Sequence, residues 1–155
     1  FYDVQTIIRV GTAGGLQSYL KVKDVVVATA ASTNSSVVTG KFGQIQFPPT
    51  PTFELVVKTK EKAEELGINA YFGTIFSNDD FYMEWNPKEF ENLVKYGTLA
   101  VEMEAAGLFM TARKHGKDSL VICTISDNSE GEDSAETREK AYTDMMRLAL
   151  EVAPE

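Results

Sequence analysis

Carboxylates stand at two points of the sequence where a strand-like segment ends. Glu102 and Glu104 flank Met103 just before a predicted helix. Carboxylate oxygens there can accept hydrogen bonds from both hydroxyls of a ribose; the structural alternative is that Glu104 caps the helix, which the helix dipole favours. Asp127 closes an apolar segment, where partial desolvation favours the protonated carboxyl and suits it to general-acid catalysis. The alternative for Asp127 is an ordinary turn or helix-capping residue.

A glycine-rich segment with an arginine lies near the start of the chain. Residues 9–15 read Arg-Val-Gly-Thr-Ala-Gly-Gly, and Arg9 and Thr12 are its polar members. A guanidinium, a hydroxyl and accessible backbone N–H groups together suit an anion such as phosphate. The glycine spacing does not match the dinucleotide-binding fingerprint. A plain tight turn explains these residues equally well.

Two aromatic residues, Phe81 and Tyr82, follow a third strand-like segment. Aromatic rings at the end of a strand can sandwich a planar heterocycle. The alternative is that they pack beneath the long polar segment 32–51, which is predicted to be a loop.

Strand and helix patterns alternate along the chain and must position these side chains. Strands are predicted at 6–10, 24–31, 70–77, 99–103 and 119–125, helices at 51 or 52–66, 87–96, 105–114 and 135–152, and mobile or glycine-rich loops at 11–15 and 129–134. The alternation predicts one α/β domain over residues 1–155, with a mixed sheet flanked by helices. Ligands in such sheets collect at the carboxyl ends of strands.

Composition narrows the classes of partner. The chain has 155 residues, 43% of them hydrophobic, and a formal net charge of −8. This charge argues against broad contacts with nucleic acid or an anionic membrane surface. Cys123 is the only cysteine, so the sequence forms no internal disulfide and no cysteine-based zinc site, which fits a reducing cytoplasm. The sequence pattern predicts neither a charged-then-apolar leader nor an apolar run of membrane-spanning length.

The motifs together, in this order, resemble the nucleoside phosphorylase family, and most closely its bacterial-type, hexameric purine nucleoside phosphorylase branch. The resemblance covers residues 6–150, and its most specific stretch is Val101–Gly107. The matching motifs are Ile8–Thr12, Ser77–Tyr82, Val101–Gly107, Thr124–Asp127 and Arg138 followed by Tyr142–Met146.

The resemblance implies a role for each candidate residue. It assigns phosphate binding to Arg9 and Thr12, ribose binding to Glu104, Met103 and Glu102, base binding to Phe81, Tyr82, Val101 and Ser126, and catalysis to Asp127, as proton donor to purine N7, with Arg138 assisting. The implied reaction converts a purine nucleoside and phosphate into free base and ribose 1-phosphate. Inorganic phosphate is then a co-substrate, and no metal or organic cofactor is expected.

The resemblance also implies a fold and an assembly. The expected fold is the three-layer phosphorylase/hydrolase-like one, with a mixed central sheet whose N-terminal strands are missing from this chain. Their absence is expected to leave an exposed sheet edge and an incomplete phosphate site. A cytoplasmic homo-oligomer, a hexamer built as a trimer of dimers, is the expected assembly.

Three alternatives to this function stay open. Nucleosidases that hydrolyse methylthioadenosine or adenosylhomocysteine look similar around Glu102–Glu104 and Ser126-Asp127, but water as nucleophile does not need the charge of Arg9. Uridine phosphorylase is less favoured, because pyrimidines lack the N7 atom that an acid at Asp127 would protonate. A non-catalytic nucleoside-binding fragment is the third alternative. The sequence leaves the preferred purine, 6-oxo or 6-amino, undecided.

Overall fold

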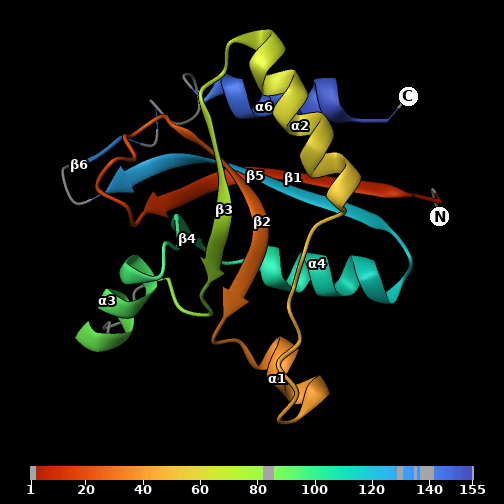
Figure 1. Ribbon diagram of the computed structural model, residues 1–155, viewed down its shortest axis with the longest axis vertical. Helices are drawn as coiled ribbons and strands as arrows, with labels where there is room; N and C mark the ends of the chain where they lie inside the picture. Colours follow the sequence, from red (N-terminus) through yellow and green to blue (C-terminus); the bar gives the residue numbers. More distant parts are fainter. Residues whose placement is uncertain (1–2, 82–85, 129–130, 135, 137–141, 155) are drawn as a thin grey trace.

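The computed structural model describes residues 3–81, 86–128, 131–134, 136 and 142–154. Strands and helices alternate through most of this length (Figure 1). The elements are β1 Thr6–Gly15, β2 Val25–Thr33, α1 Ser36–Phe42, α2 Phe53–Leu66, β3 Ala70–Ser77, α3 Pro87–Lys95, β4 Ala100–Glu102, α4 Ala105–Lys114, β5 Asp118–Asn128, β6 Gly131–Glu132 and α6 Thr143–Val152.

The sheet is mixed, as predicted, and five of its strands close into a ring. The strand order is β1-β4-β3-β2-β5-β6, and β1 also pairs with β5. Pairs β1/β5, β2/β3 and β3/β4 are parallel, whereas β1/β4, β2/β5 and β5/β6 are antiparallel. Closure brings the ends of β1, β4 and β5 together at one place.

Helices cover the sheet on both sides, with α2 and α6 on one side and α4 on the other (Figure 1). Successive side chains of a strand point to opposite faces. On β5, Leu120 and Ile122 therefore join the cluster formed with α2 and α6, while Val121 and Ile125 join the cluster formed with α4. Strand β5 is buried on both faces, which explains its nearly continuous apolar sequence.

Local signals fix several helix ends where the sequence predicts them. Gly67 follows α2 with φ +67°, and its N–H donates to the carbonyls of Ala63 and Glu64. A left-handed glycine of this kind is a common helix stop. Helix α3 begins at Pro87, and the side chain of Asn86 accepts a hydrogen bond from the Lys88 N–H at 3.1 Å. The strand 70–77 and the helix 105–114 are confirmed at both ends.

Three predicted loops are wrong. The glycine-rich segment 11–15 belongs to β1, because it pairs with β5 and, at its end, with β4. The predicted loop 32–51 contains the end of β2 and the helix α1. Within the predicted loop 129–134, Gly131–Glu132 forms β6 against β5.

The bounds of β5, β4 and the closing helix also differ from the prediction. Strand β5 continues through Ser126 and Asp127, which were expected to follow it. Asp127 pairs with Gly14 of β1 and Glu132 of β6, and Ser126 lies at the register shift between β1 and β5. Strand β4 is shorter than the predicted 99–103. The closing helix α6 begins at Thr143 and not at the predicted residue 135, because Tyr142 before it is not helical. Met145, Leu148 and Val152 are buried, as the apolar periodicity of the segment 135–152 predicts. The same periodicity places Ala141 on this face, and Ala141 lies outside the described residues.

No helix in the described part of the chain is long and apolar enough to cross a membrane.

Candidate active site

A cleft of about 580 Å³ opens where β1, β4 and β5 meet. Every predicted site residue that the structure describes lines this cleft. These residues are Arg9, Thr12, Phe81, Val101, Glu102, Met103, Glu104, Ser126 and Asp127. Tyr82 and Arg138 lie outside the described residues, so their placement stays a prediction.

Gly14 is the point where the three strands bring site residues together. It pairs with Val101 of β4 on one side and with Asp127 of β5 on the other. A Cβ at Gly14 would lie 3.0 Å from Asp127 Oδ2 and 3.3 Å from Val101 Cγ1. Because glycine has no side chain, the Asp127 carboxylate has room beside Gly14 at the cleft.

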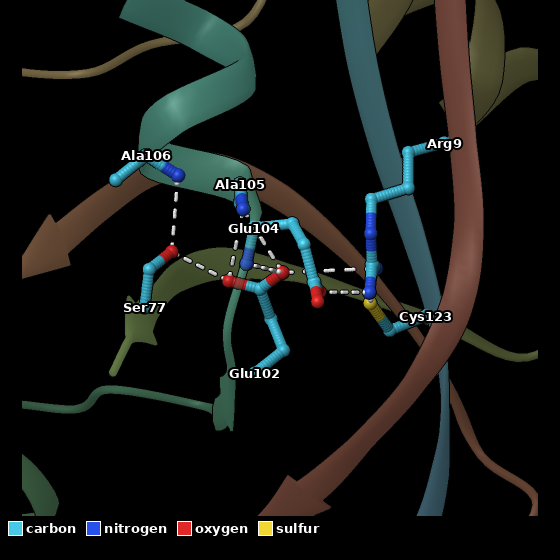
Figure 2. A network of polar contacts seen from close by, with 7 residues as sticks. All are labelled: Arg9, Ser77, Glu102, Glu104, Ala105, Ala106 and Cys123. Carbon is cyan, nitrogen blue, oxygen red and sulfur yellow. Dashed lines mark hydrogen bonds and ion pairs between the residues drawn. The ribbon is translucent and has the colours of Figure 1, made fainter. Parts of the chain in front are cut away.

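The Arg9 guanidinium contacts two carboxylates (Figure 2). Its Nη2 donates to Glu104 Oε2, and its Nη1 lies 3.6 Å from Glu102 Oε2. Cys123 Sγ, on the neighbouring strand, lies 3.5 Å from Nη1. The side chain of Arg9 keeps about a quarter of its surface exposed, 23%. A ligand in the cleft can therefore reach this positive charge.

The two carboxylates of the Glu-Met-Glu motif have different surroundings. The side chain of Glu104 is 54% exposed and forms no capping hydrogen bond to α4. The side chain of Glu102 is 1% exposed and accepts from the backbone N–H groups of Glu104 at 2.9 Å and Ala105 at 3.0 and 3.1 Å. The helix cap that the sequence suggested for Glu104 is thus provided by Glu102.

Ser77 extends this hydrogen-bond network to a third strand (Figure 2). Its hydroxyl donates to Glu102 Oε1 at 2.5 Å and accepts from the Ala106 N–H at 3.0 Å. Ser77 and Glu102 are register partners on β3 and β4. The network therefore fixes the junction of β4 and α4, from which Glu104 enters the cleft.

Asp127 receives a hydrogen bond from the residue that precedes it in the chain. Ser126 Oγ donates to Asp127 Oδ1 at 2.6 Å. Ser126 is buried, whereas Asp127 is half-buried. A carboxyl that lines a cleft with one oxygen oriented in this way can exchange a proton with a bound ligand.

Phe81 lines the cleft with most of its surface exposed, 73%. It does not pack beneath the segment 32–51 as a core residue would. An exposed aromatic ring in a cleft offers a flat apolar face to a planar ligand.

Sequence reasoning missed several residues of the site. Asn78, Asp80 and Glu132 line the cleft, as do Ala13 and Gly14. Asn78 and Asp80 lie beside the aromatic motif, so their position in the sequence could have indicated them. Glu132 could not be found in this way, because only its pairing with Asp127 across β5 and β6 brings it there.

Burial raises the pKa of the Cys123 thiol from 9.0 to about 12, an effect that the nearby Arg9 guanidinium opposes. The thiolate is the reactive form of cysteine. Cys123 is therefore an inert neighbour of the site, in agreement with its mid-strand position in the sequence.

Among the residues that the structure describes, no group of three or more His, Cys, Asp or Glu side chains could hold a metal ion.

Residues 2–154 match the phosphorylase superfamily. The chain therefore belongs to this family, and its mixed sheet flanked by helices agrees with the assignment.

Individual relatives narrow the similarity to one branch. The DeoD-type purine nucleoside phosphorylase of Caldanaerobacter subterraneus subsp. tengcongensis is 44% identical over 154 residues, which cover 98% of this chain and 66% of the relative. The DeoD-type enzymes of Listeria welshimeri and Thermoanaerobacter sp. are 43% and 42% identical over the same share of this chain and over 65% and 66% of their own lengths. The chain spans just under two thirds of the length of these relatives.

Proposed function

We propose that the protein carrying this chain cleaves purine nucleosides with phosphate, giving free base and ribose 1-phosphate. The observation that carries the proposal is one cleft lined by Arg9, Glu104 and Asp127. The names of the relatives, purine nucleoside phosphorylases, support the same reaction class.

The chemistry of glycosidic cleavage needs groups of the kinds found in this cleft. Breaking the bond builds positive charge on the sugar and negative charge on the purine. In the proposal, Asp127 protonates N7 of the leaving base, a form of general-acid help typically worth about 10²- to 10⁴-fold in rate. The Ser126 hydroxyl, donating to Oδ1, orients this carboxyl.

Arg9 and Thr12 hold the phosphate nucleophile in this proposal. A guanidinium can bind two phosphate oxygens at once. Phosphate fixed opposite the leaving base attacks the sugar carbon, and its charge stabilises the developing cation. The exposed carboxylate of Glu104 binds the ribose hydroxyls, with Met103 against the sugar and Glu102 nearby.

The base lies, in the same proposal, between Phe81, Val101 and Ser126, which line the cleft near Asp127. Tyr82 beside the base and Arg138 assisting Asp127 complete the site. Inorganic phosphate is the co-substrate, and no metal or organic cofactor takes part. We also propose a cytoplasmic homo-oligomer, a hexamer built from dimers.

Nucleoside hydrolysis is the nearest competing reaction, and Arg9 distinguishes it. A water nucleophile needs no cation in the cleft. Arg9, which also contacts two carboxylates, lines the cleft of this protein and so favours phosphate as the nucleophile. A binding fragment without catalysis is the other alternative. Incubation of the full chain with inosine and adenosine, with and without phosphate, separates the three. Phosphorolysis gives ribose 1-phosphate, hydrolysis gives free ribose without phosphate, and a binding fragment releases no base.

The role of Asp127 is tested by replacing its carboxyl with an amide. Asp127→Asn should lower turnover of inosine by about 10²- to 10⁴-fold, because the amide cannot donate an acidic proton. Turnover of 7-methylinosine, whose base leaves without protonation at N7, should fall by less than about tenfold. Steady-state kinetics on both substrates measures the difference.

Asp144→Asn is the matched control, because Asp144 is exposed in the first turn of α6 and does not line the cleft. It should retain wild-type turnover on both nucleosides. Equal losses on inosine and 7-methylinosine in Asp127→Asn would show that Asp127 is not the acid.

A further inference from the structure

The buried carboxylate of Glu102 has both oxygens occupied by protein groups. Oε1 accepts from the Ser77 hydroxyl and the Ala105 N–H, and Oε2 accepts from the N–H groups of Glu104 and Ala105. Arg9 Nη1 adds its charge at 3.6 Å from Oε2. A sugar hydroxyl could bind Glu102 only by displacing one of these donors, at the cost of a buried unsatisfied group.

Because Glu102 caps helix α4, Glu104 does not have to cap it. A carboxylate close to the first turn of a helix tends to accept from the orphan backbone N–H groups there. Glu102 already accepts from those of Glu104 and Ala105, and Ser77 accepts from that of Ala106. With these donors satisfied, the Glu104 carboxylate extends to Arg9 and the cleft instead of folding back onto α4.

Ser77 couples the cap to the sheet. It is 3% exposed, and it lies beside Glu102 in the parallel register of β3 and β4. Its hydroxyl both donates to Glu102 and accepts from Ala106, so β3, β4 and α4 meet at one oxygen atom. Loss of this hydroxyl leaves one buried N–H without an acceptor and one carboxylate oxygen with one donor fewer.

We propose that Ser77 and Glu102 are positioning residues that hold the Glu104 carboxylate toward the cleft by capping α4 in its place. This inference rests on the proposed function, in which Glu104 binds the ribose hydroxyls. In this inference Glu102 does not contact the sugar directly, and it contributes to ribose binding by positioning Glu104.

The test is a double-mutant cycle on inosine affinity, measured by calorimetry on the full chain in phosphate-free buffer. Ser77→Ala should weaken inosine binding about tenfold, the equivalent of one well-formed hydrogen bond. Ser77→Thr retains the hydroxyl and should restore affinity to within about threefold. In a Glu104→Gln background, Ser77→Ala should change affinity by less than about twofold, because the side chain that it positions has been altered.

Ser119→Ala is the matched control, since it makes the same change at a buried serine of β5 that does not line the cleft. It should leave inosine affinity unchanged. A tenfold loss from Ser77→Ala in both backgrounds, or no loss in either, overturns the inference. If Ser77→Ala does not fold, as judged by its thermal transition, Ser77→Cys takes its place. Its expected loss is smaller than tenfold, because a thiol still donates and accepts, although more weakly than a hydroxyl.

Two further measurements separate this inference from the proposed function. Base release that does not depend on phosphate defeats the proposed function, while the affinity cycle still decides the positioning role. If the wild type binds no inosine, the proposed function fails. Amide hydrogen exchange then tests whether Ser77 and Glu102 cap α4. The Ala106 and Glu104 amides should exchange faster in Ser77→Ala and return to wild-type rates in Ser77→Thr; unchanged rates would overturn the cap.

Discussion

Cys123 shows how a single buried side chain links stability to pH. The residue is 1% exposed, beneath Arg9. Burial disfavours the thiolate, and the neighbouring Glu102 and Glu104 act in the same direction against Arg9, so the pKa of the Cys123 thiol rises from 9.0 to about 12. Below pH 9 both the folded and the unfolded chain keep the proton. Between pH 9 and about 12 only the unfolded chain releases it.

The free energy of unfolding should therefore decrease as the pH rises above 9. The contribution of Cys123 decreases by about 1.4 kcal/mol per pH unit in this window. Denaturant unfolding of wild type and Cys123→Ala at pH 8 and pH 10 measures it, because other titrating groups cancel in the difference. The stability advantage of wild type over the variant should shrink by about 1.4 kcal/mol. Parallel pH dependence of the two proteins would contradict the assignment.

Residue types identify the chemistry of the site, but neighbours decide what each residue does. The sequence singles out Glu102 and Glu104 together and cannot rank them. Only the contacts separate them, with one carboxylate buried under four hydrogen bonds and the other exposed beside Arg9. The distinction depends on Ser77, whose hydroxyl comes from a different strand.

At the scale of elements, the glycines of β1 make room for polar groups. The Arg9 side chain lies over Gly11, where an added Cβ would come within 2.6 Å of Nη1 and 2.9 Å of Cζ. A strand built from ordinary residues would push the guanidinium away. The segment looks like a loop because glycine is depleted in strands. Here, close approach of side chains to the backbone explains the glycines.

Gly11→Ala should displace the Arg9 guanidinium while leaving the strand intact. Affinity for phosphate, measured by calorimetry, should fall about tenfold or more, since a bidentate charge contact is lost. The unfolding free energy should change by less than about 1 kcal/mol, because the obstructing atoms are the flexible end of a side chain. Gly40→Ala, where a Cβ meets nothing within 4 Å, is the control and should bind phosphate as the wild type does. Unaltered phosphate affinity in Gly11→Ala would show that Arg9, in the position over Gly11, does not bind phosphate.

The whole molecule depends on two apolar layers, one on each side of the strand ring. Phe109 of α4 is completely buried in the layer beneath the cleft, together with Leu99 and Val121. Because α4 starts at the Glu102 cap, this layer also supports the site. Phe109→Ala should lower the unfolding free energy by about 3–5 kcal/mol, through lost burial and the cavity left behind.

Phe53→Ala is the matched change at the surface, since Phe53 is 71% exposed at the start of α2. It should alter the unfolding free energy by less than about 0.5 kcal/mol. Denaturant titration of both variants against wild type provides the comparison. A small loss at Phe109 would show that α4 is not held by this layer.

The sequence by itself determined what near neighbours in the chain can specify. Short apolar runs rich in β-branched residues located the buried strands, and Gly67 and Pro87 marked helix ends, because local composition and caps act over a few residues. The motifs also identified most of the polar residues that line the cleft, among them Arg9, Glu104 and Asp127, but not Asn78, Asp80 or Glu132. Tertiary structure alone decided how they meet. Thr6 pairs with Asp118, and Gly14 pairs with both Val101 and Asp127. These pairings between distant segments close the ring and extend β1 and β5 to the cleft. No local pattern encodes such contacts, because their energies arise only once the strands are side by side.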